Sequence, residues 1–295
     1  MKAWVIYNGS LKLLKMNQLI EKLVADASVI GLELIPIKNN EIVPVIQKDG
    51  SLELTFLQDV PEPEFVIFWD KDILLASLLE RKGYKLYNSA QSIEICDDKS
   101  LMHAELIGRE LHMPKTIFGP FSFDYNLVND TYLDYIFTEL GDRLVLKESK
   151  GSFGMQVYMI DSREALAERI HQVGNRSFIM QEVIESSIGR DIRVNIVGDR
   201  VIGAMQRVND NDFRANITNG GVGRSLQLTN EQEELALKAH AALGLTFSGV
   251  DLLYGPDEEP MLCEVNSNVN FVSFELATGL DYAKPLLRHL MENVR

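Results

Sequence analysis

The segments Gly249-Val250-Asp251 and Met261-Leu262-Cys263-Glu264-Val265-Asn266 place Asp251 and Glu264 within two apolar runs, residues 246–254 and 260–265, and Asn266 directly after the second run. Gly255-Pro256-Asp257-Glu258-Glu259 separates the two runs. A stretch rich in Gly, Pro and Asp is typical of a turn between strands. The pattern therefore predicts two strands that pair through this turn.

Asp251, Glu264 and Asn266 would come together at one end of the sheet if these strands pair. Glu264 and Asn266 are two positions apart, so they point to the same face of a strand. Mg²⁺ commonly takes one or two carboxylates and completes its shell with water and nucleotide phosphate. This makes the three residues a candidate metal site. A hairpin with solvated acids near its ends is the alternative that these residues leave open.

The composition is that of an ordinary soluble globular protein, with 46% hydrophobic and 24% charged residues. A chain of 295 residues is long enough for two or three domains. The longest apolar runs, such as residues 65–69, fall far short of the roughly 18 residues of a membrane span. No signal-peptide cleavage pattern follows the first predicted strand, and there are only two cysteines. We therefore expect a protein of the reducing cytoplasm.

The formal net charge of −14 opposes binding to nucleic acid or to an anionic membrane, because both require a basic face. It does not exclude a small anionic ligand. A local cluster of Arg and Lys can hold phosphates within an acidic molecule, and the chain contains such a cluster.

The N-terminal part alternates strands and helices. We predict strands at residues 1–7, 32–37, 65–69 and 84–87, and helices around residues 19–30 and 73–80. That alternation indicates a small α/β sheet domain. No G-x-G-x-x-G follows the first strand, which argues against a dinucleotide-binding site.

The middle of the chain begins with a predicted helix over residues 92–111, which contains Lys99. From Lys115 the pattern becomes β-rich, and a final helix is predicted from Lys284. We predict three units: an N-terminal α/β domain (1–95), a central unit with a glycine-containing loop (96–185) and a C-terminal unit with the candidate metal site (186–295).

The loop Lys147-Glu148-Ser149-Lys150-Gly151-Ser152-Phe153-Gly154 follows a strand that ends in lysine. Glycines let backbone N–H groups approach phosphate oxygens, and a nearby lysine adds a point charge. This is not a Walker A loop, because G-x-x-x-x-G-K-[ST] is absent. A β-hairpin loop that happens to contain glycine is the alternative.

The order of these features resembles the ATP-grasp superfamily, and within it the RimK-type carboxylate–amine ligases. It runs from the Asp98-Lys99 helix and the Lys147 strand with its glycine loop, through Gln181-Glu182, Gly189-Arg190-Asp191-Ile192-Arg193 and Arg214-Ala215-Asn216, to Asp251 and Glu264-Val265-Asn266. The resemblance covers nearly the whole chain. It implies an α/β protein (α+β in its C-terminal half) with the ATP-grasp fold and an N-terminal Rossmann-like, pre-ATP-grasp domain.

The resemblance also implies roles for individual residues. Lys99 and Lys147 would contact the ATP phosphates beneath a mobile flap formed by Gly151, Ser152, Phe153 and Gly154. Glu182 and Val183 would lie at the adenine, and Asp191 would help to hold the nucleoside. Developing negative charge would be met by Arg193, Arg207 and Arg214, with Asn216 beside them. Mg²⁺, or Mn²⁺ as an alternative, would be bound by Asp251, Glu264 and Asn266.

The implied reaction is phosphoryl transfer followed by acyl transfer, in which a carboxylate attacks the γ-phosphate of ATP and an amine then displaces phosphate to leave an amide. Positioning and charge neutralisation dominate such chemistry, which suits a site of cations and metal ligands without a nucleophile. The product would carry glutamate or another amino acid on a carboxylate acceptor. A nucleotide-binding sensor without turnover and a phosphoryl transferase that stops at a phosphorylated product are the alternatives.

The expected partners are a small carboxylate and an amino acid, or the C-terminus of a small protein, and a homo-oligomer is left open. Many RimK relatives continue after Glu-Val-Asn with Ala-Ser-Pro-Gly, whereas this chain has Ser267-Asn268-Val269-Asn270-Phe271. With the later Ala277-Thr278-Gly279, this is similar to the LysX branch, which joins an amino acid to the terminal glutamate of a carrier protein. Carriers of that branch are acidic, which suits an acidic enzyme poorly.

The remaining candidate groups are interpreted as structural. Cys96 and Cys263 lie in no Cys/His signature and are expected to be buried small residues. The five histidines, His103, His112, His171, His240 and His289, show no zinc-binding spacing.

Overall fold

The computed structural model describes residues 1–10, 14–123, 128–151 and 154–294. The N-terminal part contains a four-stranded parallel sheet in the order β2-β1-β5-β6. Every residue of the central strand β5 is buried, as its unbroken apolar run predicts. The strands of this sheet are β1 (Lys2–Tyr7), β2 (Glu33–Lys38), β5 (Phe65–Trp69) and β6 (Leu86–Tyr87), and its first helices are α1 (Leu14–Val29) and α2 (Ile73–Arg81).

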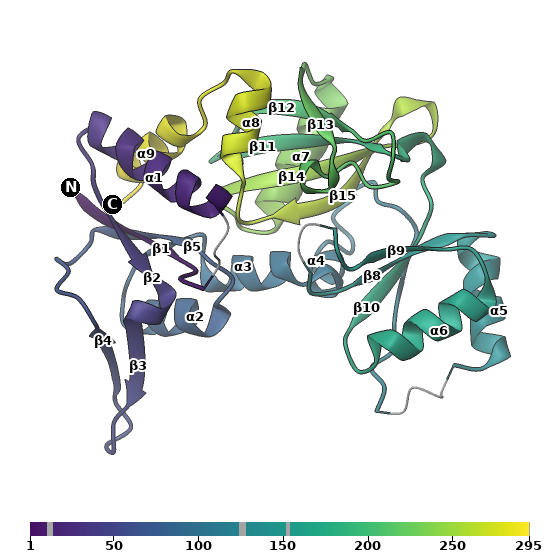
Figure 1. Ribbon diagram of the computed structural model, residues 1–295, viewed down its shortest axis with the longest axis horizontal. Helices are drawn as coiled ribbons and strands as arrows, with labels where there is room; N and C mark the ends of the chain where they lie inside the picture. Colours follow the sequence, from purple (N-terminus) through teal and green to yellow (C-terminus); the bar gives the residue numbers. More distant parts are fainter. Residues whose placement is uncertain (11–13, 124–127, 152–153, 295) are drawn as a thin grey trace.

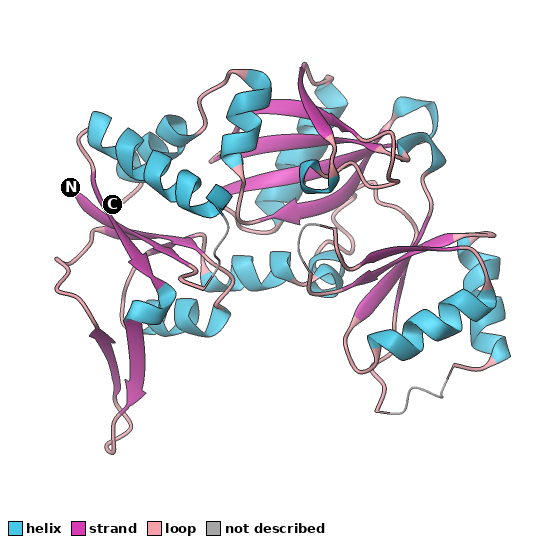
Figure 2. Ribbon diagram, in the orientation of Figure 1, coloured by secondary structure: helices cyan, strands magenta, loops and turns pink. Residues whose placement is uncertain are grey.

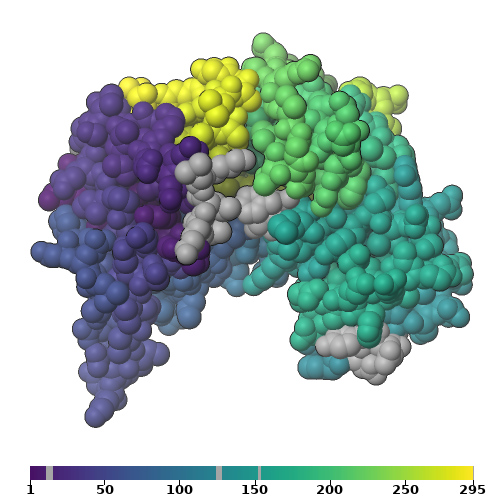
Figure 3. Space-filling model, in the orientation of Figure 1, coloured from purple at the N-terminus to yellow at the C-terminus, as the bar shows by residue number. Residues whose placement is uncertain are grey.

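An antiparallel hairpin, β3 (Ile42–Ile46) and β4 (Leu52–Phe56), projects from this part of the molecule (Figure 1). It was not predicted: β3 carries a proline, which argues against a strand, whereas the alternation of β4 was a detectable signal. Figure 3 shows that the hairpin lies on the opposite side of an open notch from the lobe formed by the central part of the chain.

The prediction of one continuous helix over residues 92–111 is wrong. The chain forms two helices, α3 (Ala90–Asp97) and α4 (Lys99–Glu105), which meet at Asp98. Asp98 has an extended backbone, and its carboxylate accepts hydrogen bonds from Ser100 N and Leu101 N, so it caps α4. Lys99 is therefore the first residue of a new helix instead of one turn inside a longer one.

The central part of the chain forms an antiparallel sheet in the order β7-β10-β8-β9. Two helices, α5 and α6, lie on one side of it (Figure 2). Their apolar faces pack against the sheet, and Ile136 and Leu166 are fully buried. Helix α5 was not predicted. The elements are β7 (Thr116–Phe118), α5 (Asp130–Leu140), β8 (Leu144–Glu148), β9 (Val157–Ile160), α6 (Arg163–Val173) and β10 (Phe178–Glu182).

The C-terminal part is built on a five-stranded antiparallel sheet in the order β13-β12-β11-β14-β15. Alternate residues of its central strands, such as Val194 and Val250, are buried against α7, and their neighbours point to the other face. Helix α7 begins with a capping box formed by Thr229 and Gln232. The elements are β11 (Arg190–Val197), β12 (Arg200–Val208), β13 (Val222–Leu226), α7 (Asn230–Ala242), β14 (Phe247–Tyr254) and β15 (Pro260–Asn266).

Two helices end the chain, α8 (Phe271–Thr278) and α9 (Ala283–Glu292), and α8 was not predicted. They join α1 and the first sheet in one apolar core, which includes Leu23, Phe271 and Leu286. The three larger sheets fall within the three predicted residue ranges. The exact division into 1–95, 96–185 and 186–295 stays a prediction, because this core crosses it. Within the described residues, no helix is both long and apolar enough to cross a membrane.

Candidate active site

The predicted hairpin is present, and it brings the candidate metal ligands together. Asp251 on β14 lies opposite Glu264 on β15, and Gly249 lies opposite Asn266. The Asn266 side chain reaches across to Gly249 O at 3.3 Å and to Asp251 Oδ2 at 3.4 Å. Two carboxylates and one amide therefore occupy one small area, as strand periodicity predicts.

Lys99 reaches this area from α4. Its Nζ lies 3.3 Å from Glu264 Oε1, and its side chain is only 8% exposed. Burial alone would lower the pKa of Lys99, but the Glu264 carboxylate outweighs burial and raises it. The same contact, against the effect of burial, holds the pKa of Glu264 below its ordinary value. Both groups are therefore charged at neutral pH.

The side chains of His103 and Gln181, for which no role in the site was predicted, help to hold Lys99 in place. His103 Nδ1 lies 2.8 Å from Lys99 O, and its Nε2 lies 3.0 Å from Gln181 Nε2 on β10. Burial lowers the pKa of His103 to about 4, so the ring is neutral and donates from Nδ1 while accepting at Nε2. The spacing of Lys99 and His103, four residues apart in one helix, matches no recognised motif and so carried no signal for this role.

Lys147 on β8 approaches from the other sheet. Its Nζ lies 3.7 Å from Cys263 Sγ, next to Glu264 in the chain. The loop after β8 is joined to α4 through the backbone. Lys99 N donates to Ser149 O at 2.9 Å, and Asp98 and Lys150 pair as an isolated antiparallel β-bridge. The helix lysine thus contacts Glu264 directly, and the strand lysine lies near enough to lower the pKa of the same carboxyl.

The predicted flap is described only at its two ends, because Ser152 and Phe153 lie outside the described residues. At the far end, Gly154 has φ +70° and its carbonyl accepts a hydrogen bond from Arg214. A Cβ on Gly154 would stand 2.9 Å from Asn216 Oδ1. The structure therefore brings Gly154, Arg214 and Asn216 together. Gly151 lies at the near end, where a Cβ would stand 2.5 Å from Gln156 Oε1.

A buried network of alternating charges lies beside the candidate metal ligands. Arg207 binds both oxygens of Asp191, at 2.6 and 2.5 Å, and also Asp251 Oδ1 at 2.9 Å. Arg193 binds both oxygens of Asp251, one of them at 2.8 Å. Against the effect of burial, the two arginines hold the pKa of Asp251 below its ordinary value. The four side chains are 5–13% exposed.

Asp191, Arg193 and Arg207 were predicted to contact ligands, and in this network they contact one another or Asp251. Four cations (Lys99, Lys147, Arg193 and Arg207) face three carboxylates (Asp191, Asp251 and Glu264), so the site is locally positive in a chain of net charge −14. A locally positive, largely buried site suits an anion such as a triphosphate. The individual roles of Asp191, Arg193 and Arg207 toward ligands stay predictions.

Three predicted residues lie farther out. Arg214 is paired with Asp212, with Nη2 2.6 Å from Asp212 Oδ2. Glu182 ends β10, and its carboxylate accepts a hydrogen bond from Lys115 N at 2.6 Å. Val183 follows it at the crossing from the central to the C-terminal sheet. Within the described residues, no hydrogen bond or ion pair joins Glu182 or Val183 to Lys99 or Lys147, and their adenine role stays a prediction.

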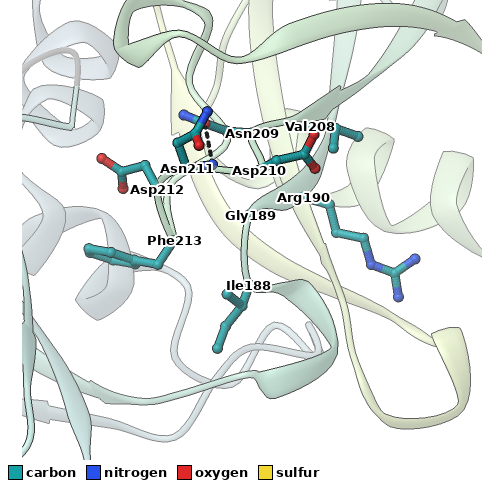
Figure 4. A pocket seen from close by; sticks show the side chains of 9 residues that line it. All are labelled: Ile188, Gly189, Arg190, Val208, Asn209, Asp210, Asn211, Asp212 and Phe213. Carbon is teal, nitrogen blue, oxygen red and sulfur yellow. Dashed lines mark hydrogen bonds between the residues drawn. The ribbon is translucent and has the colours of Figure 1, made fainter.

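A cavity of about 500 Å³ opens beside this site (Figure 4). It lies where β11 begins and β12 ends, and among its lining residues Asp212 is the partner of the predicted Arg214. Among the described residues, none of the lysines or candidate metal ligands lines it. Its lining consists of Ile188, Gly189, Arg190, Val208, Asn209, Asp210, Asn211, Asp212 and Phe213.

Relatives with similar sequences carry names of glutamate ligases and synthases. The chain is 32% identical to β-citrylglutamate synthase B of Danio rerio over 83% of this chain and 62% of that protein. It is 34% identical to N-acetylaspartylglutamate synthase A of Homo sapiens over 75% of this chain and 56% of that protein. It is 33% identical to a probable α-L-glutamate ligase of Trichodesmium erythraeum over 71% of this chain and 69% of that protein. The chain thus spans a little over half the length of the two vertebrate synthases.

Solved structures share the fold over the whole chain. The D-alanine–D-alanine ligase of Bacillus anthracis complexed with ATP superposes with a TM-score of 0.73 at 19% identity, covering 100% of this chain and 97% of that one. The ATP-grasp ligase PsnB complexed with a minimal precursor gives 0.71 at 20% identity, covering 98% of both. These matches confirm the predicted ATP-grasp fold, with its N-terminal Rossmann-like domain.

The family itself follows from a sequence model. The model of the RimK-like ATP-grasp domain matches residues 96–290, which is about two thirds of the chain and includes Lys99, Lys147 and Glu264. The resemblance and the predicted class of reaction, an ATP-dependent ligation of a carboxylate to an amine, are thereby confirmed. The chain belongs to the RimK-like ATP-grasp family of carboxylate–amine ligases.

Proposed function

We propose that this protein uses ATP and Mg²⁺ to join the amine of an amino acid, with glutamate as the first candidate, to the carboxylate of a second substrate. The names of three relatives, from a fish, a human and a cyanobacterial source, each contain glutamate. The acceptor is either a small carboxylate or the C-terminus of a small protein. The carrier-protein chemistry of the LysX branch belongs to the second of these choices.

The contact between Lys99 and Glu264 carries this proposal. It joins the helix lysine to a residue that lies opposite Asp251 on the neighbouring strand, with Lys147 at the adjoining Cys263. Cations for phosphate and oxygen ligands for a metal thus meet at one point. That pairing is what phosphoryl transfer from ATP requires, because its transition state is stabilised mainly by positioned charge.

The chemistry proceeds without a protein nucleophile. A substrate carboxylate attacks the γ-phosphorus of ATP, and the bond between that phosphorus and the bridging oxygen of the β-phosphate breaks. The products are an acyl phosphate and ADP. The amino group, after its ammonium form has lost a proton to solvent, attacks the acyl carbon; inorganic phosphate leaves, and the nitrogen loses a second proton as the amide forms. The two cysteines do not compete with this route, because burial raises the pKa of Cys96 to about 12 and also raises that of Cys263.

The residues present fit a magnesium ion. Asp251, Glu264 and Asn266 supply hard oxygen donors from adjacent strands. Within the described residues, no group of three or more His, Cys, Asp or Glu forms a complete protein cage. An ion here would take its other ligands from phosphate and water, which is the habit of Mg²⁺. When bound, the ion neutralises phosphate charge, while Lys99 and Lys147 hold the phosphates from the side of α4 and β8.

The test is a screen for ADP release with ATP and MgCl₂, across the twenty amino acids and a set of small dicarboxylates, with MnCl₂ in a parallel series. We expect ADP only when both substrates are present, and a hydroxamate when hydroxylamine replaces the amino acid. Glu264→Gln should remove metal-dependent turnover. Tight ATP binding without ADP release on any pair would favour a nucleotide-binding sensor and contradict the proposal. A stable phosphorylated product that no amine consumes would indicate a phosphoryl transferase.

A further inference from the structure

A buried carboxylate stands at the carboxyl end of the N-terminal parallel sheet. Asp70 directly follows β5 and is only 5% exposed. Its Oδ1 accepts hydrogen bonds from Asn8 Nδ2 at 3.1 Å and from Lys71 N at 2.7 Å. Its Oδ2 is buried and has no hydrogen-bond partner in the part of the chain that the structure describes.

Asn268 reaches the same place from the C-terminal sheet. It lies two residues beyond Asn266, and its Nδ2 donates to the Asp70 carbonyl at 3.1 Å. Its Oδ1 is also buried without a hydrogen-bond partner among the described residues. The contact therefore joins the loop after β5 to the loop that follows the candidate metal ligands.

Both unpartnered atoms are acceptors, and this limits the group that could satisfy them. A buried acceptor left unpaired is unfavourable, and a buried carboxylate without a cation more so. Burial raises the pKa of Asp70, and the hydrogen bonds from Asn8 and Lys71 N only partly oppose it. An anion or a carbonyl would add a third acceptor, whereas a compact cation with several N–H groups would satisfy both oxygens.

We propose that Asp70 and Asn268 form the subsite for the ammonium group of the amino-acid substrate. An alkylammonium carries three donors on one atom, which suits two unpartnered oxygens on residues that are in contact with each other. Ligands of open parallel sheets bind at the carboxyl ends of the strands, where Asn8 and Asp70 lie. Asn268 lies two residues after Asn266 in the chain, so the loop that carries it connects the subsite to the candidate metal ligands.

This inference rests on the proposed function, and it predicts a loss specific to the amine. The probe is L-glutamate, or whichever of the twenty amino acids gives the fastest ADP release. Asp70→Asn should raise the KM for that amino acid by about 10- to 100-fold, because a charged hydrogen bond is lost. The KM for ATP should stay within about two-fold. Asp59→Asn, an exposed acid of the same domain, is the matched control and should leave both values unchanged.

A second probe separates the subsite from general damage to the site. Glutarate has the two carboxylates of glutamate without the ammonium group, so its inhibition constant should be the same for the wild type and Asp70→Asn. Equal weakening of glutamate and glutarate would overturn the subsite. If Asp70→Asn does not fold, Asn268→Leu, which removes the other acceptor, takes its place with the same expected pattern.

The remaining outcomes are also decisive. If no amino acid supports ADP release, the proposed function falls and the subsite with it. If turnover is present and both variants keep the wild-type KM for the amino acid, the subsite alone is overturned. A requirement for K⁺ that disappears in Asp70→Asn, with an unchanged KM for the amino acid, would assign the two oxygens to a monovalent cation and overturn the ammonium subsite.

Discussion

Lys99 Nζ lies 3.3 Å from Glu264 Oε1, although the two residues belong to a helix and a strand in distant parts of the chain. The contact forms because Asp98 ends α3 and caps α4, which turns Lys99 toward β15. Lys99 would bind the phosphates of ATP, and Glu264 would bind the divalent ion. The ion pair therefore keeps both groups charged and in position before the substrates arrive.

Lys99→Met should lower the rate of ADP release by about 10- to 1,000-fold, because one cation at the phosphates is lost. The pKa of Glu264 should also rise, since burial would no longer be opposed by Lys99. Steady-state kinetics at saturating ATP measure the first effect. Lys48→Met, at an exposed position of the β3–β4 turn, is the control, and equal activity of the two variants would remove Lys99 from the site.

Arg207→Met should destabilise the fold by about 3–5 kcal/mol, because it leaves Asp191 and Asp251 buried without their shared partner. Urea denaturation followed by circular dichroism gives the free energy of unfolding. Arg200→Met removes a side chain that is 85% exposed and should change that free energy by less than about 0.5 kcal/mol. A small loss for Arg207→Met would mean that the buried network relaxes when its centre is removed.

Stability should fall on acidification between pH 6.5 and pH 4, because of His103 and His240. Burial lowers the pKa of each to about 4 in the folded protein, whereas in the unfolded chain it is about 6.5. The unfolded state thus binds the proton first, so the stability is fully present above pH 6.5 and is lost as the pH falls toward 4. The loss is roughly 3 kcal/mol per histidine.

His103→Gln tests this assignment, since glutamine does not take up a proton in this range. The free energy of unfolding, plotted against pH, should have a slope smaller by about 1.4 kcal/mol per pH unit than in the wild type. Parallel curves for His103→Gln and the wild type would show that His103 is protonated in the folded protein.

Gly154→Ala should impair turnover more than it impairs stability. Its positive φ of +70° costs about 1 kcal/mol for a residue with a Cβ, and that Cβ would stand 2.9 Å from Asn216 Oδ1. Gly50→Ala has the same backbone cost, at φ +83°, but meets nothing within 4 Å. The two variants should therefore unfold at similar temperatures, while only Gly154→Ala raises the KM for ATP. Equal kinetics would separate Gly154 from the flap.

Much of the fold and part of the site could be predicted because the signals are local. The unbroken apolar run of β5 predicts a central parallel strand, and the hairpin at Asp251 and Glu264 follows from two apolar runs around a Gly/Pro turn. Helix α8 escaped prediction because its apolar residues, Phe271, Val272, Phe274 and Leu276, do not gather on one face. The break at Asp98 was detectable, since Asp is a preferred N-cap, but the apolar spacing on either side favoured one helix.

The sequence by itself determined which side chains share a strand face, as with Glu264 and Asn266, because alternation along a strand depends only on the local backbone. It also determined the family, through the order of its motifs. Only the tertiary structure decided which cation faces which acid: Lys99 with Glu264, Arg207 between Asp191 and Asp251, and Asn268 against Asp70. Those partners come from different sheets and helices, and only the packing of those elements against one another brings them within a few ångströms.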